Sequence, residues 1–184
     1  MDTRDATDEE IALRVQEGDT QIFGTLVDRY EQKLKRYGKR FLSQHEDIED
    51  AVQDVFMSAY RNIQGFDLSL RFSPWIYRIA HNSFVNTLRK NDRNPLALDF
   101  DTLVSFGSHT DSVETESEQR EMRALIEHGL GSLPPKYREI LILHYTEDLP
   151  YKDIADILQI PMGTVSVRIK RAKEALRKTL EGKL

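Results

Sequence analysis

The chain has 184 residues, with 31 Asp plus Glu against 26 Lys plus Arg, 39% hydrophobic residues and no cysteine. This composition is typical of a folded chain of one domain or two small ones. The lack of cysteine excludes disulfides, thiolate zinc sites and cysteine nucleophiles. No apolar run approaches the roughly 20 residues that span a membrane. The first ten residues hold five acids and one Arg, which excludes a signal peptide, so we expect a cytoplasmic protein.

Charge is distributed unevenly behind the formal net charge of −5. Residues 31–40 hold five bases and one acid, whereas residues 41–60 hold five acids and neither Lys nor Arg. Residues 94–119 hold six acids and no base, and residues 168–184 hold seven bases and two acids. Basic patches of this size indicate a polyanionic partner and acidic ones a basic partner, although solvated helix faces give similar runs.

Apolar residues recur at helical spacing in the first ninety residues, and no convincing strand-like alternation is present. Thr7 and Glu10 form a capping box at the start of a short helix, which Gly18 ends. Apolar steps of three and four residues predict helices over residues 23–41 and 47–65. The positions expected in their cores are Phe23, Leu26, Val27, Tyr30, Leu34, Tyr37 and Phe41, and then Ile48, Ala51, Val52, Val55, Phe56, Ala59, Tyr60 and Ile63.

A fourth helix is predicted to follow Ser73-Pro74, an N-cap with proline at the first helical position, and to run from Trp75 to about Lys90. From 91 to 119 the helical period is lost, which predicts a linker. A second set of helices begins near Thr115 and breaks at Pro134-Pro135. Two helices around a turn at 159–161, the second of them basic, indicate a helix-turn-helix.

A search for catalytic groups finds no nucleophile with its base, no phosphate loop and no Glu-x-x-His pattern, so we expect neither enzymatic activity nor a cofactor. The carboxylates at 46–54 leave a helical metal enzyme as one alternative. On a helix, however, they point over a wide arc, and no Asp-Gly turn gathers them around a cation.

The last predicted helix is better explained by DNA binding. If its apolar residues face inward, Thr164, Ser166, Lys170, Arg171 and Lys173 project outward near its N-terminal half. Arg and Lys in that position read guanine or hold phosphate. A basic helix that is merely solvated is the simpler reading.

The segment from Arg71 to Lys90 mixes Phe72, Trp75, Tyr77 and Phe84 with Arg, Asn and Ser. Single-stranded nucleic acid is held by such a mixture, because unstacked bases stack on aromatic faces while Arg and Lys follow the backbone. The alternative is that these aromatic residues are core, and for Trp75 the two readings stay open.

Four motifs in this order resemble the extracytoplasmic-function (ECF) sigma factors of bacterial RNA polymerase. They are residues 47–61 (DIEDAVQDVFMSAYR), 72–82 (FSPWIYRIAHN), 133–139 (LPPKYRE), and 151–155 (YKDIA) with 160–165 (IPMGTV). The resemblance implies an all-α fold of two small helical domains, a region 2 bundle over 1–92 and a region 4 helix-turn-helix over 117–184. A flexible acidic linker over 93–116 would join them and lie in the polymerase channel.

The resemblance also implies partners and site residues. It implies binding to core polymerase through the beta-prime clamp helices and the beta flap, and to promoter DNA, by a chain that is monomeric when free; an anti-sigma factor stays open. The implied polymerase contacts are Asp50, Gln53, Asp54 and Phe56. The implied contacts to the minus-ten element are Arg71, Trp75, Arg78, His81, Asn82, Ser83, Asn86 and Arg89. Those to the minus-thirty-five element are Thr164, Ser166, Val167, Arg168, Lys170, Arg171 and Lys173.

One departure from the family pattern concerns the turn of the helix-turn-helix. Gln159 stands where many relatives have glycine, so we expect a left-handed backbone there. The alternative to a sigma factor is a dimeric helix-turn-helix regulator on a palindromic site, which leaves the first ninety residues unexplained.

Overall fold

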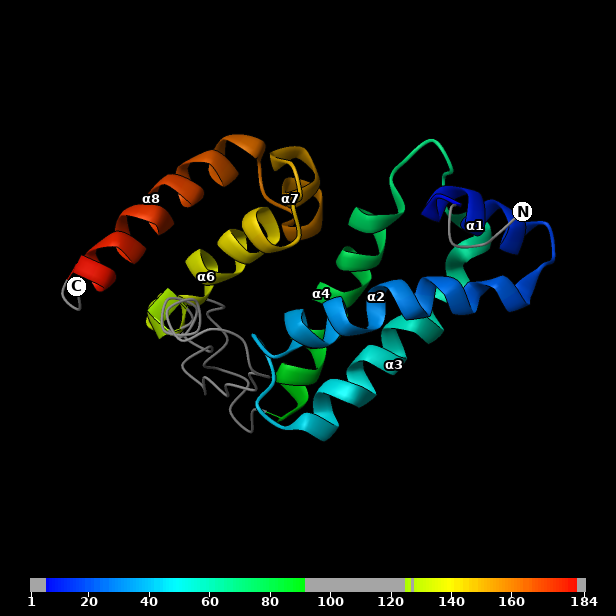
Figure 1. Ribbon diagram of the computed structural model, residues 1–184, viewed down its shortest axis with the longest axis horizontal. Helices are drawn as coiled ribbons and strands as arrows, with labels where there is room; N and C mark the ends of the chain where they lie inside the picture. The colour runs from blue at the N-terminus through cyan, green and yellow to red at the C-terminus, as the bar shows by residue number, and fades with distance from the viewer. Residues whose placement is uncertain (1–5, 92–124, 127, 182–184) are drawn as a thin grey trace, which may run out of the picture. The chain divides into compact units, whose positions relative to one another are not determined.

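The computed structural model describes residues 6–91, 125–126 and 128–181, and the predicted linker over 93–116 lies outside these residues. Within the described residues the fold is all-α, as predicted. The chain divides into two compact units. The first contains α1 (Asp8–Gln16), α2 (Phe23–Gly38), α3 (His45–Asn62) and α4 (Phe72–Asn91). Short 3-10 turns η1 (Thr20–Ile22) and η2 (Ile63–Gly65) precede α2 and follow α3 (Figure 1).

Helix α1 begins and ends as the sequence predicts. The Thr7 side chain accepts the Glu10 amide at 3.2 Å, while the Glu10 carboxylate accepts the Thr7 amide at 2.8 Å. Gly18 adopts a left-handed backbone with φ 108°, and the amides of Gly18 and Asp19 donate back to Val15 and Arg14. This pattern is a Schellman motif, which supplies partners for the last carbonyls of the helix.

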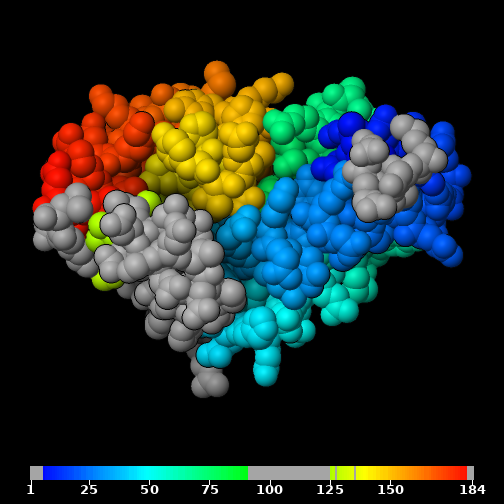
Figure 2. All heavy atoms as spheres, viewed as in Figure 1, coloured from blue at the N-terminus to red at the C-terminus, as the bar shows by residue number. Residues whose placement is uncertain are grey.

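The core of the first unit lies between α2, α3 and α4, which pack against one another. Figure 2 shows the heavy atoms of the first unit, coloured blue to green, in close contact on the face in view. The predicted apolar stripes are buried with two differences: Val27 is half-buried and Tyr60 is 43% exposed. Ala59 occupies the buried position in the helical turn that contains Tyr60. The Tyr60 ring packs edge-on against the Phe23 ring, with their centres 5.2 Å apart.

Most aromatic residues of α4 belong to this core. Phe72, Tyr77 and Phe84 are at most 1% exposed, and the Tyr77 and Phe84 rings pack edge-on against Tyr37 at 5.5 and 5.8 Å. The reading of these three rings as a stacking surface for single-stranded nucleic acid is therefore wrong. The predicted start of the helix is also corrected, because α4 begins at Phe72 and Pro74 lies within its first turn.

Helix α1 is tied to α2 and α4 by two carboxylates. Asp8 accepts hydrogen bonds from Tyr30 and, at 2.7 Å, from Arg29. Glu9 accepts the backbone N–H of Phe72 at 2.8 Å and so supplies an acceptor at the start of α4. The first amides of a helix lack intrahelical partners, so this bond between α1 and α4 fixes where α4 begins.

Tyr30 gives a pH-dependent prediction. Burial, followed by the hydrogen bond to Asp8, raises the pKa of the Tyr30 hydroxyl above its ordinary value of 10.0. A raised pKa in the folded state stabilises the fold fully below the unfolded pKa, and this stabilisation is lost as the pH rises above it. We expect the free energy of unfolding to fall above pH ~10, by up to about 1.4 kcal/mol per pH unit more steeply than in Tyr30→Phe. Urea unfolding between pH 9 and pH 11 measures this, and parallel curves for the two proteins would contradict it.

The second set of helices contains the helical residues 125–126 and 128–131, α6 (Pro135–Leu141), the π-helical turn η3 (Ile142–Thr146), α7 (Tyr151–Leu158) and α8 (Met162–Glu181). The predicted break is confirmed, with Pro134 as N-cap and Pro135 at the first position of α6. Helix α6 packs against α8, which buries Val165, Ile169 and Ala172. Leu176 and Leu180, expected to be inward, are half-buried and flank Gly129.

A buried arginine binds the end of the helical residues 128–131. Arg138 is 6% exposed, and its guanidinium donates to the carbonyls of Leu130 at 2.8 Å, Leu133 at 3.2 Å and Gly131. The last carbonyls of a helix lack intrahelical donors. Arg138 therefore connects the end of that helix to α6.

The turn between α7 and α8 has the backbone that the sequence predicts. Gln159 has φ 53°, in the left-handed region that favours glycine. Its side-chain amide donates to the Asp156 carbonyl at 2.6 Å, and the next amide, of Ile160, donates to Ala155 at 3.1 Å. These local bonds hold the turn in place of the missing glycine.

Candidate functional site

Helix α3 presents one continuous exposed face. Its members recur at steps of three and four residues, which places them opposite the buried stripe. They are Glu46, Glu49, Asp50, Gln53, Asp54, Met57, Tyr60 and Arg61. The first three turns of this face, which we call the α3 face, are acidic.

The acids of the α3 face differ in what they contact. Glu49 accepts from Lys35 of α2 at 3.2 Å and lies 3.4 Å from the His45 ring. The Lys35 hydrogen bond, followed by His45, lowers the pKa of the Glu49 carboxyl. Asp50 and Asp54 are exposed and take part in no ion pair within the described part of the chain. Together with the exposed Glu46 at the start of the helix, the two aspartates are available to a basic partner.

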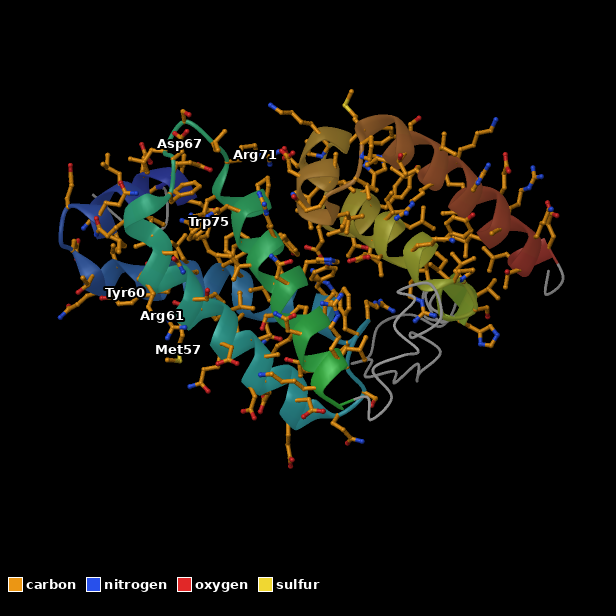
Figure 3. The ribbon with its side chains drawn as sticks, turned by 180° about the vertical axis from the view of Figure 1, so that it is seen from behind. Met57, Tyr60, Arg61, Asp67, Arg71 and Trp75 are labelled. Carbon is orange, nitrogen blue, oxygen red and sulfur yellow. The ribbon has the colours of Figure 1, made fainter. Side chains whose placement is uncertain are left out.

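Sequence reasoning missed the far end of the α3 face. Figure 3 shows Met57, Tyr60 and Arg61 along the C-terminal half of α3, ahead of the loop that carries Asp67 and Arg71. Met57 is 50% exposed and Tyr60 43% exposed. The apolar rhythm assigned Tyr60 to the core, and the signal that could have corrected this is Ala59, which fills the same turn.

A second exposed stripe runs along α4 and the residue before it. Arg71, Trp75, Arg78, Asn82, Asn86 and Arg89 follow one another at steps of four and three residues. Trp75 is half-buried and the others are exposed. This α4 stripe combines three arginines, two asparagines and one indole, a mixture suited to a nucleic-acid strand.

Trp75 lies where the loop over 66–71 meets α4. The centre of its ring lies 5.0 Å from the centre of the Phe66 ring and 5.3 Å from that of Phe72. One side of the indole therefore packs on the core, while the residue stays partly accessible. In the loop, Asp67 accepts from the Ser69 hydroxyl at 2.7 Å and amide at 2.9 Å, and these bonds lower the pKa of the Asp67 carboxyl. Both readings of Trp75 therefore have support in the structure.

Three sequence-predicted site residues are directed into the fold. Phe56 is 8% exposed and lies in the core of the first unit, away from the α3 face. The Nδ1 of His81 lies 3.4 Å from the Tyr37 hydroxyl, and the Ser83 hydroxyl donates to the Ala51 carbonyl at 3.4 Å. The structure thus does not bring Phe56 onto the α3 face with Asp50, Gln53 and Asp54, nor the side chains of His81 and Ser83 onto the α4 stripe.

Helix α8 carries the third surface. Ser166, Val167, Lys170, Arg171 and Lys173 are exposed, whereas Thr164 and Arg168 are half-buried. Lys173 lies 5.9 Å from the centre of the Tyr145 ring. Lys170 and Arg171 form no ion pair within the described residues, so their charges are available to a polyanion.

The described residues give no support to the metal-enzyme alternative. Among them, no group of three or more His, Asp or Glu side chains is placed to hold a metal ion. In the same part of the chain, no helix is both long and apolar enough to cross a membrane.

The exposed faces of α3, α4 and α8 are acidic, arginine-rich and basic. They define the class of this protein, which is an all-α protein that contacts nucleic acid and another protein. The models of Sigma-70 region 2 and Sigma-70 region 4 match residues 26–94 and 123–176. The chain is 36% identical over 175 residues to the ECF RNA polymerase sigma factor SigW of Bacillus subtilis, covering 91% of this chain and 93% of that protein. It is also 36% identical over 183 residues to the ECF RNA polymerase sigma-E factor of Haemophilus influenzae, covering 95% and 96%.

The chain belongs to the ECF sigma factors of the sigma-70 family. As a sigma factor it directs RNA polymerase to promoters, and the dimeric regulator is not favoured. Among solved structures, it resembles the sigma factor RpoE of Bartonella quintana in complex with the anti-sigma factor NepR, with a TM-score of 0.67 and 25% identity over 86% of this chain and 96% of that one. The fold also matches CnrH in complex with the cytosolic domain of CnrY, with a TM-score of 0.69 and 24% identity over 95% and 97%.

Proposed function

We propose that this sigma factor divides its work between two domains, residues 1–92 and 117–184, joined by the acidic linker over 93–116. The first binds core polymerase and opens the minus-ten element, and the second reads the minus-thirty-five element. One observation carries this division: Asp50 and Asp54 of α3, and Lys170 and Arg171 of α8, are exposed and form no ion pair inside the described part of the chain.

The α3 face is proposed to dock on the clamp helices of the beta-prime subunit through Asp50, Gln53 and Asp54. Two unpaired aspartates one turn apart suit a basic surface, because they meet it without first breaking an internal ion pair. Phe56 is left out of this contact, since its ring belongs to the core.

The α4 stripe is proposed to hold the separated strand of the minus-ten element. Arg71, Arg78 and Arg89 would follow the phosphates, and Asn82 and Asn86 would read exposed base edges. Trp75 would stack on an unpaired base with the accessible part of its indole. His81 and Ser83 support this surface from behind, through their bonds to α2 and α3.

Helix α8 is proposed to enter the major groove of the minus-thirty-five element with Ser166, Val167, Lys170 and Arg171 toward the bases. Thr164, Arg168 and Lys173 border this group and are placed to contact phosphates. The second partner of this domain would be the beta flap of polymerase.

We further infer that the chain has no catalytic activity of its own, requires no cofactor and is monomeric when free. Its place of action would be the cytoplasm, where bacterial polymerase and promoters meet. The sigma factor RpoE of Bartonella quintana, which resembles this chain, forms a complex with the anti-sigma factor NepR. An anti-sigma factor is therefore a reasonable partner for this chain as well.

Reconstituted transcription tests the proposed function. The purified chain and bacterial core polymerase are mixed with a pool of promoter fragments, and transcripts are mapped to their start sites. We expect starts that need both proteins and share two upstream elements. A chain that leaves core polymerase inactive and binds a palindrome as a dimer would overturn the proposal.

Lys170→Ala and Arg171→Ala are expected to weaken binding of the holoenzyme to its promoter by ~1–3 kcal/mol each, if either contacts a base. The matched control is Arg177→Ala on the same helix, because Arg177 lies two turns further on and is paired with Glu181 at 3.3 Å. Filter binding of promoter fragments at fixed salt measures the loss. Equal losses in the control and the two variants would indicate a general charge effect instead of base contacts.

A further inference from the structure

Two positions on the exposed face of α8 carry neither charge nor hydrogen-bonding side chains. Gly163 and Val167 lie one turn apart, on the face that also carries Ser166, Lys170 and Arg171. The proposed function accounts for the polar members of this face. It gives no role to the glycine and does not say which group on the bases the exposed valine would meet.

The fold itself does not require a glycine at position 163. The residue has no left-handed backbone, and a Cβ added to it would meet no atom within 4 Å. Without a side chain at this position, the backbone at the start of α8 is open to the close approach of a partner from outside the protein.

Val167 lies next to Gly163 on the exposed face of α8. Its side chain is 49% exposed although it is apolar and β-branched. Helical side chains lean toward the N-terminus, so Val167 covers the turn that contains Gly163. The Cα of Gly163 and the methyl groups of Val167 together form a small apolar surface between polar neighbours, which we call the apolar step.

Resting on the proposed role of α8, we propose that this apolar step receives the C5 methyl group of a thymine in the minus-thirty-five element. That methyl is the apolar group that base edges present in the major groove. The exposed Ser166, Lys170 and Arg171 around the step bring DNA, and not an apolar protein surface, against it. Gly163 then lets the helix come close enough for Val167 to touch the methyl.

Uracil substitution tests the methyl contact directly. Promoters are selected from a random pool by the holoenzyme, and each thymine of the upstream element is then replaced by uracil. We expect one position at which holoenzyme binding weakens about fourfold, as for the loss of one buried methyl group. In Val167→Ser, thymine and uracil at that position should bind equally well. A wild-type holoenzyme that is indifferent to every such replacement overturns the proposal.

The glycine is tested by a matched pair of variants. Gly24 is likewise the exposed second residue of a helix, α2, and a Cβ there also meets no atom within 4 Å. We expect Gly163→Ala to keep or raise the melting temperature while weakening promoter binding about tenfold. Gly24→Ala should change the melting temperature in the same direction and leave promoter binding unchanged. Unchanged binding in Gly163→Ala would overturn the close approach.

A control separates failure of this inference from failure of the proposed function. Arg171→Ala and a scrambled upstream element are measured in the same assay. If both reduce binding while uracil and Gly163→Ala do not, α8 reads the promoter without the apolar step. If none of the changes has an effect, α8 does not contact the promoter, and the proposed function fails with the inference.

Discussion

Replacement of both Asp50 and Asp54 of α3 by lysine is expected to abolish binding of the chain to core RNA polymerase while leaving its fold intact. Both carboxylates are exposed and form no ion pair within the described residues. Surface substitutions of this kind usually change stability by no more than about 0.5 kcal/mol each. The polymerase surface, in contrast, would meet two positive charges where it accepts two negative ones, and like charges across an interface cost several kcal/mol.

Co-elution with core polymerase on a sizing column measures this effect, and thermal unfolding by circular dichroism checks the fold. Glu17→Lys with Asp28→Lys is the matched control. It makes the same change of charge in the same unit, at exposed acids outside α3 that also have no described ion pair. Retained co-elution of the α3 variant, or its loss in the control as well, would refute the assignment of this face.

The second large effect is expected on stability. Arg138→Ala should destabilise the C-terminal unit by on the order of 3 kcal/mol, because the partly buried carbonyls at and after the end of the helical residues 128–131 lose a charged donor. The carbonyls of Leu130, Gly131 and Leu133 lose their guanidinium partner together. Removal of the side chain also leaves a cavity beside α6.

Urea unfolding followed by hydrogen exchange locates this loss. We expect faster exchange in α6 and α8, with the amides of α1 to α4 unchanged. Arg138→Lys is the informative comparison, since an ammonium group cannot reproduce the fork of donors that reaches three carbonyls. A lysine variant as stable as the wild type would show that the charge, and not the fork, holds this end of the helix.

The local elements could be predicted from the sequence because their signals are local. A capping box, a glycine after the helix and a period of 3.6 residues are sufficient to position α1, α2 and α3. Gln159 was predicted in a left-handed backbone from its place in the turn. The exposed residues of α8 also follow directly from its amphipathic pattern.

Tertiary contacts explain what the sequence could not predict. The sequence pattern does not show which aromatic residues of α4 contact Tyr37 and which stay accessible. It therefore indicates a binding surface for three rings, those of Phe72, Tyr77 and Phe84, that lie in the core. Nor does it show that Lys35 of α2 reaches Glu49, which separates this acid from Asp50 and Asp54. Helix α4 begins earlier than predicted because Glu9, 63 residues away, supplies an acceptor for the Phe72 amide.

That same hydrogen bond bears on the order in which the molecule folds. Helix α1 spans nine residues, and isolated helices of that length are not stable in water, so α1 forms as it docks. The Phe72 amide gains its acceptor in the same event, which is a late one because it closes a loop of more than sixty residues. We therefore expect the first turn of α4, which carries Trp75, to be completed only after the remainder of the bundle has assembled.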